Sequence, residues 1–311
     1  MEIAIVKEIA AHGKELRPIF LPREVKRLVE EKQHIFIEKG LGAGIYIPDS
    51  EYAQTGARLT GNRKELFRKN IVVKLKPPLP QEFRLLRGNL LFCMLHAEQN
   101  PQNLRLLKAA GSRAIAMELI RNRAGERLIS CCQISGEQGM IMAFHLAKKS
   151  PSDCNVLVLG YGTVATGALK VALSLGAKVK ILRKSEYKYI RHFLRRKDIV
   201  VNAISWPREE RARREYLITK DMLCLLNKGA IILDLSVDYP NPIETCQPTL
   251  IDHPAYQVEG VTHISIFGYP GLVPISSSVR YSRQALPILL KIASLPLNKL
   301  PPYLKKALIE P

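Results

Sequence analysis

The sequence predicts an α/β protein built from two Rossmann-like domains, each with a mostly parallel sheet, and a cleft between them. Short apolar runs alternate with amphipathic segments along the chain, and 311 residues are enough for two cores. Near the middle, a glycine-rich turn separates an apolar strand from a helix. We expect one domain at residues 1–128 plus 287–311 and the other at residues 129–286.

The first domain is expected to begin with alternating strands and helices. Strands are predicted at "EIAIV", "HIFIEK", "NIVVKLK", "NLLFCMLH" and "RAIAMEL". Helices are predicted between them at "REVKRLVEEK", "DSEYAQTG", "QEFRLLRG" and "NLRLLKAAG". This order is typical of an open parallel sheet with helices as crossover connections.

The second domain repeats the alternation after a helix at "GEQGMIMAFHLAKKS" (136–150). Its strands are predicted at "NVLVLG", "KVKIL", "DIVVNAI", "GAIILDLS" and "THISIFG", with a helix at "TKDMLCLLNKG". The last helix, "SRQALPILLKIASL", is expected to pack back on the first domain.

The composition is that of a basic globular protein. Lys and Arg number 47 against 28 Asp and Glu, a formal net charge of +19, which attracts anions. The densest basic runs, "YKYIRHFLRRK" and "REERARRE", also contain apolar or acidic residues and are interpreted as solvated helix faces. We therefore expect small-molecule partners, and neither nucleic acid nor membrane.

Cysteine spacing and apolar run lengths suggest a cytoplasmic protein. The six cysteines show no C-x-x-C pattern, so we expect thiols and no metal site. No run of 18 apolar residues indicates a membrane span, and the start of the chain does not resemble a signal peptide.

A dinucleotide site is predicted at "VLVLGYGTVATG" (156–167). Gly160, Gly162 and Ala165 form a G-x-G-x-x-A pattern in which the backbone of the turn, Thr163 and Val164 approaches a pyrophosphate. A tight structural turn is the alternative. The next strand but one ends at Ala203 and Ile204, which are also expected to contact the cofactor.

The end of the strand "KVKIL" favours NADPH over NADH. Arg183, Lys184 and Ser185 stand where an NAD site usually has an acidic residue for the ribose hydroxyls. Cationic and hydroxyl groups suit a 2′-phosphate. The alternative is that they are ordinary surface cations, and NADH remains possible.

Several segments together resemble the alanine dehydrogenase/pyridine nucleotide transhydrogenase family. They are "VKEIAAHGKELRPIFLPREVKRLV", "VVKLKPP", "GNLLFCMLHA", "AIAMELI", "NKGAIILDLSVDYPNPIETCQPT" and "GVTHISIFGYPGLVPISSS". The compact loops and the basic strand end are more similar to the N5-(carboxyethyl)ornithine synthases, NADPH-dependent opine-type enzymes within that family.

The resemblance implies roles for five residues. Arg17 and Lys76 match the family's ligands for the keto-acid carboxylate and carbonyl, and Glu118 is expected to assist substrate binding by orienting Lys76 or the histidine. His96 and Asp238 match its catalytic acid/base histidine and aspartate.

Two departures from the family separate this chain from simple alanine dehydrogenation. Gly268 stands where an Asn near the nicotinamide is common, which leaves more room there. "SCCQISG" replaces the usual Ser-Glu segment, so Cys132 is expected to line the cofactor site.

The resulting expectation is a homo-oligomeric, NAD(P)H-dependent oxidoreductase of amino acid metabolism. It would reductively couple a pyruvate-like α-keto acid to the side-chain amine of an amino acid. The alternatives are alanine dehydrogenase-type amination with ammonia, saccharopine dehydrogenase-type chemistry, and a catalytically silent nucleotide sensor or nucleic-acid-binding protein.

Overall fold

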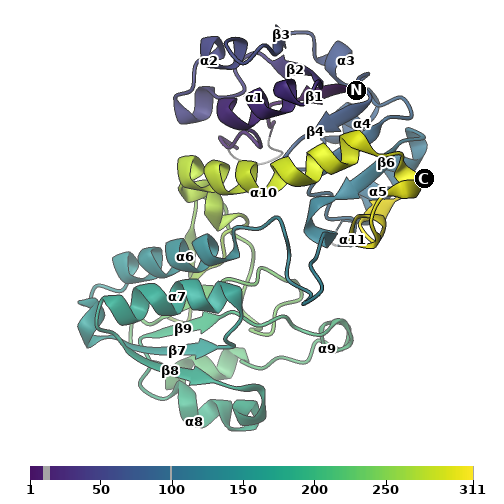
Figure 1. The fold of residues 1–311 in the computed structure, drawn as a ribbon. Coiled ribbons are helices and arrows are strands. Elements are labelled where there is room, and N and C mark those ends of the chain that lie inside the picture. Colours follow the sequence, from purple (N-terminus) through teal and green to yellow (C-terminus); the bar gives the residue numbers. More distant parts are fainter. Residues whose placement is uncertain (10–14, 99, 311) are drawn as a thin grey trace. The chain divides into compact units, whose positions relative to one another are not determined.

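A computed structural model describes residues 1–9, 15–98 and 100–310, and the backbone alone of residue 208 (Figure 1). The chain forms two compact units. Unit 1 contains Met1–Ser130 and Val273–Pro311, and unit 2 contains Cys131–Leu272. Each unit is described separately below.

Unit 1 contains a seven-stranded sheet in the order β13-β6-β5-β4-β1-β2-β3. Only the edge strand β13 is antiparallel to its neighbour. The strands are β1 (Glu2–Ile5), β2 (His34–Glu38), β3 (Arg58–Thr60), β4 (Ile71–Val73), β5 (Leu90–Cys93), β6 (Arg113–Ala116) and β13 (Leu308–Ile309). The strands are nearly continuously apolar because helices cover the parallel sheet.

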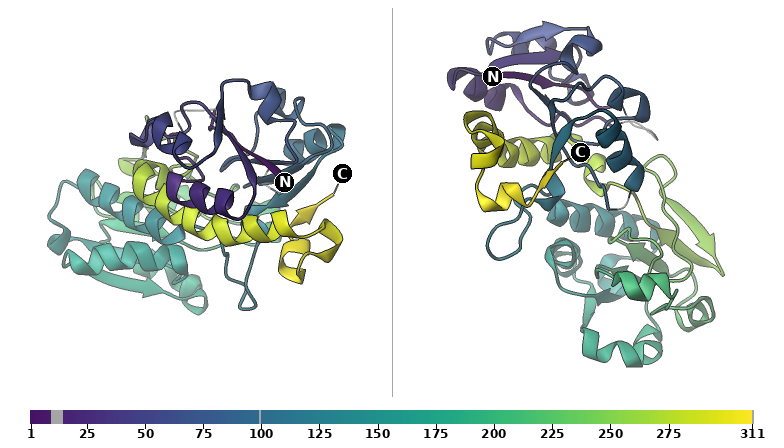
Figure 2. Two further views of the ribbon diagram at one scale, coloured as in Figure 1. Left: turned by 45° about the horizontal axis from the view of Figure 1, so that its top comes forward. Right: turned by 90° about the vertical axis from the view of Figure 1, so that its right-hand side faces the viewer.

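Helices of unit 1 come from both ends of the sequence. The long helix α10 (Pro274–Ser294) packs on α1 (Pro22–Glu30) (Figure 2). At this contact the Ser282 hydroxyl donates to Glu24 at 2.9 Å and accepts from the Leu21 amide at 3.0 Å. The predicted domain boundary after residue 286 falls inside α10, which lies wholly in unit 1. The helices are α1 (Pro22–Glu30), α2 (Asp49–Ala53), α3 (Arg63–Leu66), α4 (Pro80–Phe83), α5 (Pro101–Ala109), α10 (Pro274–Ser294) and α11 (Pro302–Lys305), with 3-10 turns η1 (Ala43–Ile45), η2 (Met117–Leu119) and η7 (Leu297–Lys299).

Unit 2 contains a six-stranded sheet in the order β11-β12-β10-β9-β7-β8. Only β11 is antiparallel to its neighbour. The strands are β7 (Asn155–Leu159), β8 (Lys178–Leu182), β9 (Ile199–Asn202), β10 (Ile231–Asp234), β11 (Ala255–Val258) and β12 (Val261–Ile264).

Two cores cover the two faces of this sheet. Val156 and Val158 pack toward α6 (Cys132–Leu146) and α7 (Thr163–Ser174), whereas Leu157 and Leu159 belong to the opposite core. This alternation follows from the two-residue period of a strand. The remaining helical segments are η3 (Pro151–Asp153), η4 (Lys184–Tyr189), α8 (Ile190–Leu194), α9 (Arg208–Ala212), η5 (Lys220–Leu225) and η6 (Tyr269–Leu272).

The predicted fold class is confirmed, since both sheets are mostly parallel and alternate with helices. Three details differ. The segment "TKDMLCLLNKG" forms the 3-10 turn η5 rather than an α-helix. The strands β3, β11 and β13 were not predicted. The Glu-Gly pair between β11 and β12 is a turn signal that was overlooked. In the structure, Glu259 and Gly260 form the hairpin turn with positive φ of 49° and 74°.

No helix in the described part of the chain is long and apolar enough to cross a membrane.

Candidate active site

The carboxyl ends of the parallel strands in unit 1 bring together three of the predicted residues. Lys76 follows β4, His96 follows β5 and Glu118 follows β6. The sheet order reverses between β1 and β4, and ligands of open α/β sheets bind beside such a switch point. Adjacent strands that end on functional side chains therefore place those groups at one edge.

Lys76 is held through its backbone by a buried carboxylate that the sequence did not reveal. Glu8 follows β1 and accepts the amide protons of Leu75 at 2.6 Å and Lys76 at 3.3 Å. Burial lowers the pKa of Lys76, and the positive charge of Arg17 acts in the same direction. Glu15 and Glu8 oppose this shift.

Beneath Glu8 lies a chain of buried ion pairs. The fully buried Lys74 contacts Glu8 at 3.4 Å and Glu82 at 3.8 Å, and its ammonium also donates to the Lys7 carbonyl at 3.2 Å. Arg63 in turn pairs with Glu82 and Glu38. Lys74 and Lys76 alternate with Leu75 in "VVKLK", which places both lysines on one face of the strand. This spacing was the available sequence signal for a charged cluster at that strand end.

Arg17 is buried, with 3% of its surface exposed, and pairs with Glu15. The Glu15 carboxylate accepts from Nε of Arg17 at 2.6 Å and also from Nη2. Burial raises and the Arg17 guanidinium lowers the pKa of Glu15, and the net direction is downward. Both charges act on Lys76, so Arg17 belongs electrostatically to the same strand edge.

His96 adopts a left-handed backbone conformation with φ 49°. This region is sparsely populated by residues other than glycine, so the turn requires support from its surroundings. Burial lowers the pKa of His96 to about 4, and the positive charges of Lys76 and Arg127 act in the same direction. The imidazole is therefore neutral at pH 7 when no ligand is bound.

Glu118 supplies that support. Its two carboxylate oxygens accept the amide protons of His96 at 2.7 Å and Leu95 at 3.1 Å, and its side chain is 6% exposed. Burial raises the pKa of Glu118, while these backbone amides oppose the shift. The Glu118 carboxylate thus contacts the backbone of the turn at residues 95–96, and its role in orienting the histidine stays a prediction.

In unit 2, the glycine turn lies at the switch point between β7 and β9. Gly160 has φ 87°, and a Cβ atom there would lie 2.8 Å from a methyl of Ile204 and 3.0 Å from the carbonyl oxygen of Ala203. The predicted contacts Ala203 and Ile204 are therefore brought beside the glycine turn. Only glycine suits both this conformation and this approach.

The start of α7 is shaped for an anion. Gly162 is the N-cap, and a Cβ atom there would meet nothing within 4 Å, so packing within the protein does not require a glycine. Thr163 and Val164 open the helix and contribute unpaired N–H groups of its first turn, while Ala165 is fully buried. The residues present fit a dinucleotide pyrophosphate.

Two further glycines, Gly136 and Gly167, bring α6 and α7 into direct backbone contact. A Cβ atom at Gly136 would lie 2.0 Å from the carbonyl oxygen of Val164, and one at Gly167 would lie 2.0 Å from that of Gln133. Gly167 completes the motif "GYGTVATG", and its packing role was missed in the sequence.

The basic residues after β8 are exposed. Arg183, Lys184 and Ser185 all present their side chains to solvent at the start of η4. Glu186 was missed. Its carboxylate accepts the Arg183 amide proton at 2.9 Å and pairs with Lys180 at 3.1 Å.

Asp238 follows β10 on a loop that Asp234 anchors. Asp234 is completely buried, and its Oδ1 accepts the amide protons of Ser236 at 3.2 Å and Val237 at 3.4 Å. Val237 has φ 52°, which is unusual for a β-branched residue. Asp238 itself lies 3.8 Å from Nη1 of Arg211.

Asp234 is also the centre of a neutral hydrogen-bond network, and burial raises its pKa. Its partners include the side chains of Asn202 at 2.8 Å, Asn241 at 2.7 Å and Ser265 at 2.6 Å. Asp234 thus fixes the loop that carries Asp238.

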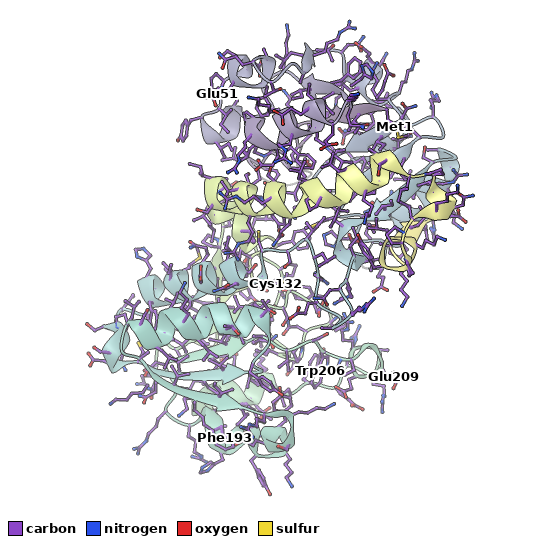
Figure 3. All side chains as sticks on the ribbon, in the orientation of Figure 1. Met1, Glu51, Cys132, Phe193, Trp206 and Glu209 are labelled. Carbon is purple, nitrogen blue, oxygen red and sulfur yellow. The ribbon has the colours of Figure 1, made fainter. Side chains whose placement is uncertain are left out.

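The two departures from the family pattern are also placed in unit 2. Cys132 is the first residue of α6 and is labelled in Figure 3. Its side chain is half-buried. Gly268 has φ 102°, so its backbone conformation itself favours glycine. Within residues 1–9, 15–98 and 100–310, no three His, Cys, Asp or Glu side chains cluster as metal ligands.

Comparison with known proteins agrees with this arrangement. Residues 4–135 match the alanine dehydrogenase/PNT N-terminal domain, and residues 181–306 match the corresponding C-terminal domain. Alanine dehydrogenase of Methanococcus maripaludis is 29% identical over 94% of this chain and 88% of its own length. Alanine dehydrogenase 1 of Staphylococcus aureus is 26% identical over 94% of this chain and 87% of its own length.

Solved structures show the same fold. An L-alanine dehydrogenase superposes with a TM-score of 0.87 at 27% identity, covering 100% of this chain and 95% of its own. A transhydrogenase from Sinorhizobium meliloti has a TM-score of 0.80 at 21% identity, covering 94% of each chain. Both domains of one family are matched in order along the sequence, and the chain belongs to the alanine dehydrogenase/PNT family.

Proposed function

We propose that this protein is a nicotinamide-dependent oxidoreductase that reductively couples a pyruvate-like α-keto acid to the side-chain amine of an amino acid. The reaction would be of the N5-(carboxyethyl)ornithine synthase type. The observation that carries the oxidoreductase assignment is that each unit has functional groups at the carboxyl edge of its own sheet. One holds Arg17, Lys76 and His96, and the other has a glycine turn open to a pyrophosphate.

The keto acid would bind at the edge of unit 1. The Arg17 guanidinium would hold its carboxylate, with Glu15 fixing the plane of the guanidinium, and the Lys76 ammonium would polarise its carbonyl oxygen. Burial of both cations strengthens these interactions, because water screens them less.

Proton transfer would be shared by His96 and Asp238. The amine enters as an ammonium ion and gives up two protons as it adds to the carbonyl carbon. Both protons pass to the carbonyl oxygen, which leaves as water, and an iminium remains. The neutral imidazole of His96 would accept each proton from the nitrogen and pass it to the oxygen. The Asp238 carboxylate stabilises the iminium charge. The glycine turn at Gly160 and Gly162 would hold a nicotinamide cofactor, whose chemistry when bound is hydride transfer to such a carbon.

Substrate binding would also tune His96. Lys76 and Arg127 both lower the pKa of the imidazole in the empty site. A carboxylate bound beside either cation would offset its charge and raise the pKa of His96 toward its usual range. The histidine would then accept and release a proton near neutral pH only when an anionic substrate is present.

One feature supports an amino-acid amine. Gly268 replaces the family's common Asn, and its φ of 102° is consistent with a loop that carries no side chain there. The second candidate is alanine dehydrogenation with ammonia as the amine, which the names of the most similar relatives favour.

An amine screen separates these functions. Purified protein would be assayed for NADPH and NADH oxidation with pyruvate plus ammonia, ornithine or lysine. We expect the highest kcat/KM with ornithine. Turnover with ammonia alone would establish the alanine dehydrogenase reaction, and preference for lysine would indicate saccharopine-type chemistry. No oxidation with any pair, together with salt-sensitive DNA binding, would support a silent binding protein.

NADPH is the proposed cofactor, because Arg183, Lys184 and Ser185 are exposed directly after β8. The change Arg183→Asp would remove a cation and add an acceptor for the ribose hydroxyls. We expect the ratio of the Kd values for NADPH and NADH to shift at least tenfold toward NADH, measured by fluorescence titration. Arg195→Asp, farther along the same basic segment, is the control. An unchanged ratio would remove the basis for NADPH.

A further inference from the structure

The amino ends of the parallel strands in unit 1 surround a pocket of about 440 Å³. Asn70 directly precedes β4, Asn89 directly precedes β5 and Arg113 begins β6, and all three residues line the pocket. The candidate active site lies beyond the carboxyl ends of the same strands. Each of these strands has three or four residues, so about 10 Å of sheet separates the two places.

Cationic side chains dominate the polar lining of this pocket. No Asp or Glu is found among the lining residues that the structure describes. In the described part of the chain, neither Arg68 nor Arg113 has an ion-pair or hydrogen-bond partner for its guanidinium. The Arg87 guanidinium donates only to two backbone carbonyls, at 2.8 and 2.9 Å, which leaves its charge unpaired. The cationic lining residues are Arg68, Lys69, Arg87 and Arg113.

Asn89 joins the three segments that carry these arginines. Its Nδ2 donates to the two backbone carbonyls on either side of Arg68, at 2.7 and 3.0 Å. Its Oδ1 accepts the amide proton of Arg87 at 3.2 Å, and its backbone carbonyl accepts the amide proton of Arg113 at 3.2 Å. One side chain and its own backbone therefore hold three like charges around one space, although like charges repel one another.

The remaining wall of the pocket is apolar. It comes from the end of α10 and from η7, where Ile292 is buried and Leu295 and Leu297 are half-buried. Lys69 adds less charge than the arginines do, because it pairs with Glu2 at 3.4 Å. The pocket thus combines unpaired guanidinium groups with exposed hydrocarbon, and its volume lies in the range of small-molecule sites.

We propose that this pocket binds a small organic phosphate, with the phosphate group on Arg68, Arg87 and Arg113 and the carbon portion against the apolar wall. Three guanidinium groups offer more donors than the two oxygens of one carboxylate can accept. A phosphate monoester has three terminal oxygens and up to two negative charges, which matches several arginines at once. The site would be independent of the reaction at the carboxyl ends of the strands.

The test compares ligands that share a ring and differ in their anionic group. Isothermal titration calorimetry would measure the Kd values of phenyl phosphate, benzoate and inorganic phosphate for the wild type, Arg68→Gln, Arg113→Gln and Arg105→Gln. Arg105 is an exposed arginine of α5 outside the pocket lining, so its substitution removes the same charge and serves as the matched control.

We expect phenyl phosphate to bind the wild type more tightly than inorganic phosphate and at least tenfold more tightly than benzoate. Arg68→Gln and Arg113→Gln should each raise the Kd of phenyl phosphate at least tenfold, as for loss of a hydrogen bond between charged groups. Arg105→Gln should change it less than twofold. Equal melting temperatures would show that the variants are folded.

A second measurement locates the ligand on the unaltered protein. Phenylglyoxal modifies arginine side chains, and peptide mass spectrometry would follow its rate at each arginine. Phenyl phosphate should slow modification of Arg68 and Arg113 at least fivefold and leave Arg105 unaffected.

Three outcomes would overturn the proposal. Equal weakening by Arg105→Gln and Arg113→Gln would mean that phenyl phosphate responds only to the general positive charge. Benzoate binding as tightly as phenyl phosphate would assign the pocket to carboxylates. Unprotected Arg68 and Arg113 at saturating phenyl phosphate would place the ligand elsewhere. None of these results depends on which amine the enzyme uses.

Discussion

The carboxyl edges of the two sheets solve the same problem with different chemistry. In unit 1, Glu118 supports a left-handed residue, His96, within a group of charged side chains that includes Lys74 and Glu8. In unit 2, Asp234 supports a left-handed residue, Val237, within amides and hydroxyls.

The difference follows from what each edge must meet. A buried carboxylate needs donors, and either ion pairs or neutral groups can provide them. Unit 1 surrounds its carboxylates with cations that would also meet an anionic substrate. Unit 2 uses neutral donors around Asp234, which leaves the backbone of its glycine turn as the anion-binding element.

The largest effect is expected where the two helices of unit 2 touch. Gly167→Ala would place a methyl 2.0 Å from the Gln133 carbonyl oxygen, so α6 and α7 must separate. We expect a loss of about 3 kcal/mol or more in the free energy of unfolding, measured by urea denaturation. Gly162→Ala meets nothing within 4 Å and should change stability little while weakening nucleotide binding. Equal destabilisation by both changes would contradict the assigned roles.

A pH-dependent effect on stability is expected from His96 in unit 1. The pKa of His96 is about 4 in the folded protein, below its usual value of 6.5. The unfolded chain therefore binds a proton first as the pH falls, and stability decreases between about pH 6.5 and 4. His96 contributes about 3 kcal/mol to this decrease. Unfolding curves of His96→Gln should show a smaller loss over that range, and parallel curves would refute the depressed pKa.

The two supporting carboxylates can be compared directly by amide substitution. Asp234→Asn replaces one acceptor oxygen with a donor that faces the other donors of its network. We expect the free energy of unfolding to fall by about 2–3 kcal/mol, because buried donors that lose their acceptor remain unsatisfied. Thermal unfolding would measure it. A neutral result would show that Asp234 is already protonated.

Glu118→Gln should lower the free energy of unfolding less than Asp234→Asn. The Glu118 carboxylate accepts the backbone amide protons of Leu95 and His96 and is not the centre of a side-chain network like that of Asp234. We expect about 1–2 kcal/mol of lost stability. If Glu118 positions His96, kcat would fall more than KM rises, and the pH profile of kcat would shift. An unaltered pH profile with reduced stability would indicate a purely structural role.

Much of this organisation is legible in the sequence. Apolar alternation predicts both sheets, and strand ends predict where Lys76, His96 and Asp238 lie, because parallel strands align their carboxyl ends. The glycine motif predicts the turn at Gly160. These inferences depend on local periodicity and on one rule of topology.

The rest depends on contacts between distant segments. Glu8 lies 68 residues before Lys76 in the sequence, and nothing in "VKEIAAHG" shows that its carboxylate caps another strand end. The two-residue strand β13 is too short for any periodicity to reveal it.

That short strand has a consequence for the order in which the protein folds during synthesis. Unit 2 is continuous in sequence, whereas unit 1 needs residues 273–311 to complete it. β13 pairs with β6, and the Ala116 amide donates to the Ala307 carbonyl at 2.9 Å, two residues before Glu118. Because domains fold as their residues emerge, unit 2 can be finished first. The edge that carries Glu118 gains its outer neighbouring strand only after residues 308–309 have left the ribosome.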